Sequence, residues 1–372
     1  MRKIIIYIVV CVIAITGCTN NNSISIDSAK DISKELVLSE DALSGIDVRE
    51  HILPIPQNGE IGDEAVFGDI IYYSVLYMEN MSNYANRVEI YSYNTENKDT
   101  NKIYEYKNFN DLFYLNELKA TDDKLYWNMI SSDGIGWEIY EFDLISMQTK
   151  AIHSSNVSNP INIPSLTISN QLLAWYEIYK GDAYDEVSLV IYSFETREVE
   201  SNNDQIHLFS PYDRAFIRDD FLTYLTLNED NIIVNVWDTI NGNIQELEFE
   251  IGTRILNIRS NGEITVWHEN YGESDVYVYD HISNELYLIS SEDDATRIFS
   301  IDLFDDFVLI NDKKTKKIYG VNIINKKIFD FTREIQGVTS NYIMSGISAD
   351  NQFKTVNKTS ENEIFCLVFE YR

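Results

Sequence analysis

The chain has 372 residues, of which 60 are acidic and 29 are Lys or Arg, so its formal net charge at pH 7 is −31. A protein of this charge repels nucleic-acid phosphates and anionic lipid headgroups, which argues against a nucleic-acid partner and against electrostatic adsorption to a membrane. The length is sufficient to bury a large apolar core.

The N-terminus has the pattern of a secretory signal peptide. Met1, Arg2 and Lys3 precede twelve uncharged residues, IIIYIVVCVIAI, at positions 4–15. This run is too short to cross the roughly 30 Å hydrocarbon core as a helix, which takes about 20 residues. We therefore predict that the segment directs export and is then removed.

Residues Ile15-Thr16-Gly17-Cys18 resemble the lipobox of bacterial lipoproteins. The resemblance implies a signal peptide at residues 1–17 and diacylation of the Cys18 thiol, with cleavage on the N-terminal side of Cys18. Two acyl chains anchor a protein stably, whereas one binds only marginally. We therefore expect a lipid-anchored protein on the extracytoplasmic side of the cell membrane. The alternatives are an ordinary secretory peptide and a lone transmembrane anchor.

The next segment, residues 18–45, is rich in Asn and Ser and cannot bury enough apolar surface to fold alone, so we predict a flexible linker there. A folded domain is expected over residues 46–372. Cys11 leaves with the signal peptide and Cys18 carries lipid, so Cys366 has no partner for an intrachain disulfide. The domain must therefore be stabilised by burial of its core.

A five-residue motif recurs through this domain. Its first position is aliphatic, its second is usually Tyr, its third is variable, its fourth is aromatic or aliphatic, and its fifth is Asp, Asn or Glu. The copies begin at Ile90, Ile139, Ile191, Val234, Val276 and Ile318, with a degraded copy at Ile364. The intervals of 49, 52, 43, 42, 42 and 46 residues fit four-stranded propeller blades. The alternation of residue types within the motif predicts a strand with two different faces, and the polar residue that ends the motif predicts a turn.

A second strand is predicted upstream of each copy. It begins with Asp, Asn or Gly, and an aliphatic residue follows two positions later. These aliphatic residues, which we expect in the core, are Ile71, Leu125, Leu172, Leu222, Ile264, Val308 and Ile343.

We therefore predict an all-β fold, a β-propeller of seven four-stranded blades, with six blades as the alternative. The seventh unit, from about residue 337 to the C-terminus, ends before its fourth strand. Residues 47–56 precede the first unit and could supply that strand, closing the ring between the N-terminal and C-terminal chain. Closure of this kind removes free sheet edges.

The segments DGIGWEIYEFD, from Asp133, and YGESDVYVYD, from Tyr271, resemble TolB-type propeller repeats. This group of propellers includes periplasmic scaffolds, peptidase-associated domains and some polysaccharide lyases. The resemblance covers most of the mature chain and implies the fold, but it does not choose among these functions.

The loops between the predicted second and third strands are long and rich in tyrosines and acids. Aromatic rings beside acids suit sugar faces and hydroxyls, or a basic protein surface. The alternative is that the loops simply share in a composition with 25 tyrosines. The candidate binding residues are Tyr84, Asp133, Tyr179, Asp182, Tyr184, Asp185, Glu269 and Tyr271.

No catalytic residue, metal site or cofactor is predicted. The five histidines lack the spacing of a helical zinc site, and His268, which could be a general base, is interpreted as a loop residue. Two functions follow from the sequence. The preferred one is a non-catalytic binding or scaffold protein for an envelope protein or glycan. The alternative is an extracellular carbohydrate-active enzyme, a polysaccharide lyase or glycoside hydrolase.

Overall fold

The computed structural model describes residues 24–39, 46–78, 85–107, 113–131, 136–155, 164–180, 185–202, 206–208, 214–228, 230–268, 275–290, 298–304, 307–312, 317–330, 342–347, 353–358 and 364–371. Strands account for most of these residues, as the sequence predicts. The helical segments among them are two single 3-10 turns, η1 (Ile26–Ser28) and η2 (Ser33–Glu35). No helix within these ranges is long and apolar enough to span a bilayer.

Most strands belong to groups of four that are consecutive in the sequence and hydrogen-bonded antiparallel. The first two groups share one sheet and meet at the pair Ala85–Phe113. Their strands are β4 (Glu60–Phe67), β5 (Ile70–Met78), β6 (Ala85–Asn94), β7 (Thr100–Lys107), β8 (Phe113–Ala120), β9 (Lys124–Ser131), β10 (Trp137–Asp143) and β11 (Gln148–Ser154). Each four-stranded unit is named below by its strands, such as the β4–β7 group.

Four further groups follow, each within its own sheet. Their strands are β12 (Thr167–Ile168), β13 (Leu172–Lys180), β14 (Asp185–Ser193), β15 (Val199–Asn202), β16 (Phe216–Arg218), β17 (Phe221–Leu227), β18 (Asn231–Asp238), β19 (Ile244–Glu250), β20 (Leu256–Ser260), β21 (Ile264–His268), β22 (Val276–Asp280), β23 (Glu285–Ile289), β24 (Ile298–Phe304), β25 (Phe307–Asp312), β26 (Lys317–Asn322) and β27 (Lys327–Asp330).

The last sheet combines the two ends of the domain. Strands β28 (Tyr342–Ile347), β29 (Phe353–Lys358) and β30 (Ile364–Tyr371) are joined by β3 (Ile46–Leu53). The antiparallel register of β3 and β30 runs from Ile46 opposite Tyr371 to Leu53 opposite Ile364. The N-terminal chain therefore supplies the fourth strand of a sheet that the C-terminal chain begins, as expected for the segment at 47–56.

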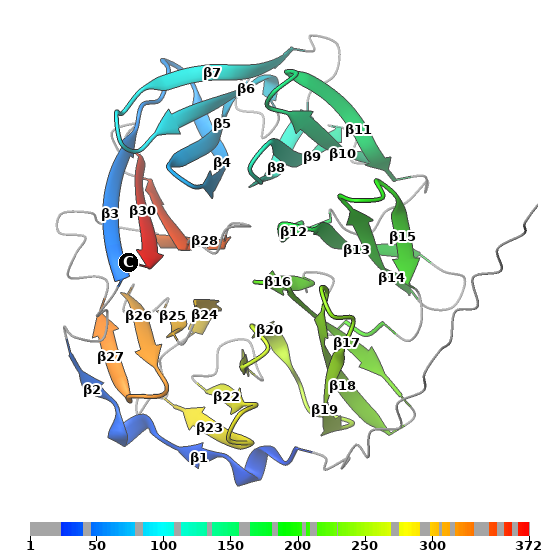
Figure 1. The fold of residues 1–372 in the computed structure, drawn as a ribbon, viewed down its shortest axis with the longest axis vertical. Coiled ribbons are helices and arrows are strands. Elements are labelled where there is room, and N and C mark those ends of the chain that lie inside the picture. The colour runs from blue at the N-terminus through cyan, green and yellow to red at the C-terminus, as the bar shows by residue number, and fades with distance from the viewer. Residues whose placement is uncertain are drawn as a thin grey trace, which may run out of the picture.

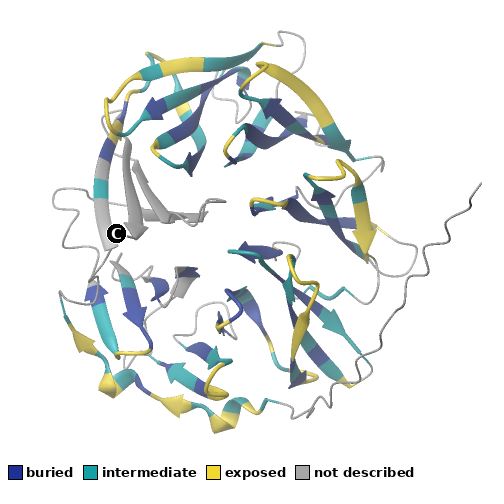
Figure 2. Ribbon diagram, in the orientation of Figure 1, coloured by how far each residue is buried: buried dark blue, intermediate teal, exposed yellow. Residues whose placement is uncertain are grey.

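The groups surround a common centre (Figure 1). The first strand of each group lies nearest this centre and the fourth lies on the outside, so β4, β8 and β12 are inner strands and β7, β11 and β15 are outer strands. Figure 2 shows that the outer strands β7, β11, β15 and β19 are more exposed than the second and third strands of their groups.

The aliphatic positions predicted for the second strands form much of the core. Six of the seven lie on second strands and are at most 6% exposed: Ile71, Leu125, Leu172, Leu222, Ile264 and Val308. The seventh, Ile343, is a correction, because it lies on the first strand β28 and the second strand of that group is β29. Its 21-residue distance from the motif at Ile364 spans an additional strand, which the pattern alone did not separate from a loop.

The acids that end the repeated motif open turns, as predicted. Asp238 Oδ1 accepts hydrogen bonds from the backbone N–H groups of Ile240 (3.0 Å) and Asn241 (2.9 Å), and Asp143 and Asp280 make equivalent bonds two and three residues ahead. The turn then passes through a left-handed residue, Gly242, with φ of 73°. Glycine adopts this φ without the steric cost of a Cβ.

Residues 24–39, which we call the N-terminal belt, differ from the flexible linker predicted for residues 18–45. Within the belt, β1 (Lys30–Asp31) pairs in parallel with β23, and β2 (Val37–Leu38) pairs in parallel with β27. Between them, Ile32 is fully buried in the apolar cluster shared by the β20–β23 and β24–β27 groups. Sparse apolar residues at suitable spacing thus allow a mostly polar segment to bind the outside of the domain.

We predict that the belt contributes to the stability of the folded unit through Ile32. In protein beginning at Thr19, Ile32→Ala should lower the free energy of unfolding by about 2–5 kcal/mol, because it removes buried methyl groups and leaves a cavity. Val37→Ala is the matched control: Val37 lies in the same segment but is 62% exposed, so its effect should stay within about 0.5 kcal/mol. If urea unfolding showed equally small losses of stability for both substitutions, the belt would not be packed against the domain.

Candidate functional site

The described part of the chain contains two of the predicted binding residues, Tyr179 and Asp185. They lie at the same end of the β13–β14 hairpin, where Tyr179 is opposite Glu186 and Lys180 is opposite Asp185. Tyr179 is half-buried. The other predicted residues lie outside the described residues: Cys18, Tyr84, Asp133, Asp182, Tyr184, Glu269 and Tyr271.

Several tyrosines serve a structural purpose, since their hydroxyls bond to buried acids. Glu141 is 5% exposed, and its Oε2 accepts hydrogen bonds from Tyr126 (3.4 Å) on β9 and Tyr192 (3.1 Å) on β14. Lys150 Nζ lies 3.1 Å from the other carboxylate oxygen. Because Tyr192 belongs to the next group, Glu141 connects the β8–β11 and β12–β15 groups. Burial, with Glu141 nearby, raises the pKa of Tyr192 to about 12, so the hydroxyl keeps its proton.

A histidine strengthens the same boundary between groups. His153 Nε2 on β11 lies 2.6 Å from Glu177 Oε1 on β13, and Trp175 Nε1 donates to that oxygen at 3.0 Å. His153 also packs between the rings of Trp137 and Trp175, with ring centroids 5.8 and 5.4 Å away. This histidine therefore has a packing and cross-linking role.

The inner strands carry a set of polar side chains that the sequence analysis did not identify. Each accepts a hydrogen bond from the backbone of the next inner segment along the chain. Asp63 Oδ2 accepts from Leu118 N–H (2.7 Å), Glu117 Oε2 from Leu166 N–H (2.6 Å) and Thr167 Oγ1 from Ile217 N–H (2.8 Å). We call these three contacts the inner clamps. They connect the first four groups one after another around the centre.

Glu117 is the most elaborate of these acceptors. Its carboxylate also accepts from Ser165 Oγ (2.8 Å), and it lies 3.2 Å from Arg214 Nη1 and 3.8 Å from Lys119 Nζ. Burial alone would raise the pKa of Glu117. The charges of Lys119 and Arg214, with the hydrogen bonds from Ser165 and Leu166, outweigh burial and hold that pKa below its ordinary value.

Asp302 on β24 is the corresponding buried acid across the centre. Its Oδ1 accepts from Leu303 N–H (2.9 Å) and lies 3.7 Å from Arg259 Nε on β20. Burial raises the pKa of this carboxyl, and the positive charges of Arg259, Arg218 and Lys119 partly offset the rise. The Arg259 guanidinium also lies over the Phe216 ring, 4.5 Å from its centroid. Asp302 and Arg259 thus connect two neighbouring groups.

Two histidines lie at the β20–β23 group. His268 is the last residue of β21, is 1% exposed, and its Nε2 lies 2.7 Å from Asn257 Nδ2. The interpretation of His268 as a loop residue is therefore wrong, because the strand continues through it. His281 Nε2 lies 2.7 Å from Thr265 Oγ1, and burial lowers the pKa of His281 to about 4, so the ring is neutral at pH 7.

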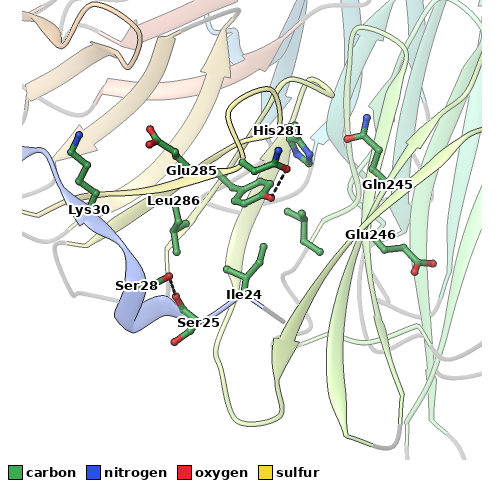
Figure 3. Close-up of a pocket in the computed structure, with 12 residues that line it drawn as sticks. Ile24, Ser25, Ser28, Lys30, Gln245, Glu246, His281, Glu285 and Leu286 are labelled. Carbon is green, nitrogen blue, oxygen red and sulfur yellow. Dashed lines mark hydrogen bonds between the residues drawn. The ribbon is translucent and has the colours of Figure 1, made fainter. Parts of the chain in front are cut away.

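A cavity of about 940 Å³ lies at the outside of the domain, beneath the start of the belt. Figure 3 shows Ile24, Ser25 and Ser28 of the belt on one side, with Gln245 and Glu246 of β19 and Leu286 of β23 around them. The cavity therefore lies between two adjacent groups and the belt that crosses them. It is distant from the centre on which the inner strands converge (Figure 1).

No protein-family model and no curated protein matches this sequence. Solved structures do match it. The β-propeller domain of the Trilobed protease from Pyrococcus furiosus aligns with a TM-score of 0.58 at 14% identity, over 84% of this chain and 94% of that one. The acylaminoacyl peptidase of Pyrococcus horikoshii aligns with a TM-score of 0.53 at 11% identity, over 81% of this chain and 49% of that one.

These structures share with this chain sheets of four antiparallel strands set around a centre. The chain folds as a β-propeller. The N-terminal domain of Nup159 also aligns with this chain, with a TM-score of 0.52 at 8% identity, over 93% of this chain and all of that one. This chain spans about half the length of the acylaminoacyl peptidase. At these identities the likeness establishes the fold, and each strand group can be called a blade, but no activity is transferred with it.

We predict that Glu117→Gln lowers the free energy of unfolding at pH 7 by about 1–3 kcal/mol, because the neutral amide is a weaker acceptor for buried donors and ends the attraction to Arg214. Because folding lowers the pKa of Glu117, its contribution is present above the ordinary value of 4.5 and is lost as pH falls through the lowered value.

The difference between wild type and Glu117→Gln should therefore shrink below pH 4.5 in urea titrations repeated across pH. Glu200→Gln, at an exposed position on β15, is the control and should change stability by less than about 0.5 kcal/mol. A difference that is independent of pH would show that the charge of Glu117 is not what the fold uses.

Proposed function

We propose that this protein is a cell-surface lipoprotein whose β-propeller binds an envelope protein or glycan without acting on it. The inner clamps carry this proposal. In propeller enzymes of any class, convergent titratable groups must be available to a substrate. Here three acids of the inner strands make contacts between blades: Asp63 and Glu117 accept backbone N–H groups of the next blade, and Asp302 lies 3.7 Å from Arg259 of the preceding one.

We also infer that the strand groups are seven blades of one ring, closed where β3 pairs with β30. The support is the register of that pair over eight residues and the position of both strands in the same sheet. A propeller built in this way has no free edge at the junction of its ends. Such a rigid scaffold suits a binding protein, whose recognition loops need fixed positions.

The lipid anchor is tested by Cys18→Ala in the full-length chain, expressed in bacteria supplied with labelled palmitate. We expect loss of label and retention of residues 1–17, because the thiol is the group that accepts the diacylglyceryl unit before cleavage. Cys366→Ala is the matched control and should leave labelling and cleavage unchanged. Unlabelled, correctly cleaved protein from both variants would instead indicate an ordinary secretory peptide.

The binding face is tested with soluble protein that begins at Thr19, immobilised and exposed to detergent-solubilised envelope proteins and to wall glycan fragments. We expect one bound species, identified by mass spectrometry, whose capture falls at least tenfold in Tyr179→Ala and Tyr184→Ala. Tyr106→Ala, at a half-buried tyrosine on the outer strand β7, is the control and should bind normally. Release of shortened glycan would show that the protein is a carbohydrate-active enzyme instead.

A further inference from the structure

The belt determines the point at which the proposed lipid anchor leaves the propeller. Ile24, the first described residue, donates its backbone N–H to Glu248 O (2.7 Å) and pairs in parallel with Phe249 of the outer strand β19. Phe249 is fully buried, and Ile24 and Ile26 pack against its apolar cluster. The tether to Cys18 therefore starts from the rim of the propeller, at blade β16–β19.

From Ile24 the belt continues along the rims of the next two blades. Backbone hydrogen bonds join Ile32 N–H to Leu288 O (3.0 Å), Val37 N–H to Lys326 O (3.0 Å) and Ser39 N–H to Ile328 O (2.9 Å). The backbone N–H of Ser290 also donates to Ser33 Oγ (2.7 Å), and Glu35 forms an ion pair with Lys326. With contacts on three blades, the belt holds its first residue in a fixed position.

The tether between this point and the lipid is short. Cys18 and Ile24 are six residues apart in the sequence, a separation that even a fully extended chain cannot stretch beyond roughly 20–22 Å. A folded domain of this size has a radius of gyration of about 20 Å and hence a diameter of about 50 Å. The anchored rim must therefore stay close to the bilayer, whereas blade β4–β7 lies across the ring from it (Figure 1).

The negative charge of the protein determines the orientation of the propeller on this tether. Loss of Arg2 and Lys3 with the signal peptide leaves a net charge of −33. Anionic headgroups repel such a protein strongly within a Debye length, about 8 Å at physiological ionic strength. A propeller lying flat would bring a whole face within this range. An upright propeller would bring only a narrow rim near the bilayer. The tether is long enough for that rim, with its exposed Glu246 and Glu250, to stay more than a Debye length from the headgroups.

We propose that the propeller is presented edge-on to the membrane, with the rim formed by the belt, β19 and β23 facing the bilayer. This inference rests on the lipid anchor proposed above. In this orientation the axis of the ring lies parallel to the membrane plane. Both faces of the propeller are then accessible to partners in the envelope.

The experiment uses full-length, acylated protein in vesicles of phosphatidylcholine and phosphatidylglycerol (3:1) that contain an acceptor dye on their headgroups. Donor dyes are attached to Asn241→Cys or Asn97→Cys in a Cys366→Ser background. Both positions are exposed turns between the third and fourth strands of a blade, so they lie on the same face of the propeller and differ in position around the ring. We expect several-fold higher energy transfer from position 241 than from position 97.

Equal transfer from the two positions, or higher transfer from position 97, would overturn edge-on presentation, since a flat or freely rolling propeller gives no such difference. Insertion of about 20 Gly and Ser residues after Asn22 lengthens the tether and should abolish the difference. Protein that does not float with the vesicles and carries no acyl chain would instead overturn the lipid anchor itself, and with it this inference.

Discussion

The inner clamps are the interaction on which the rest of the propeller depends. An inner strand pairs with its second strand along one edge, and its other edge presents backbone N–H groups that need acceptors where water is scarce. Asp63, Glu117 and Thr167 supply those acceptors from the preceding blade. The clamps thereby align successive blades, and they explain why Asp63 and Glu117 lie on inner strands.

Much of the fold could be predicted from the sequence because each blade repeats one local pattern. Alternation specifies a strand with a buried face, so the aliphatic column from Ile71 to Val308 identified the core correctly. The strands of the seventh unit could not be assigned from spacing alone. Ile343 fits the pattern of the second strands, but it lies on the first strand of its group. The belt escaped prediction for a different reason. Ile32 is buried by strands more than 200 residues away, and such contacts leave no local periodicity.

The charged residues of the inner strands could have been predicted by comparing the repeats. A charged residue lies four to eight positions before the aliphatic column in several units, as with Glu117 before Leu125, Arg259 before Ile264 and Asp302 before Val308. An ionisable residue at one position of an apolar strand indicates a buried partner. Which backbone group it contacts could not be predicted, because that depends on the angle between neighbouring blades.

The pairing of β3 with β30 also affects the order of events during folding. Ile46–Leu53 is synthesised more than 300 residues before its partner Ile364–Tyr371. The partner of β3 is therefore missing while the intervening chain is made, and the entropy of closing a loop of more than 300 residues must be overcome at the end. The edge of β3 stays open to mispairing until β30 has been made, so chaperones have a defined segment to protect.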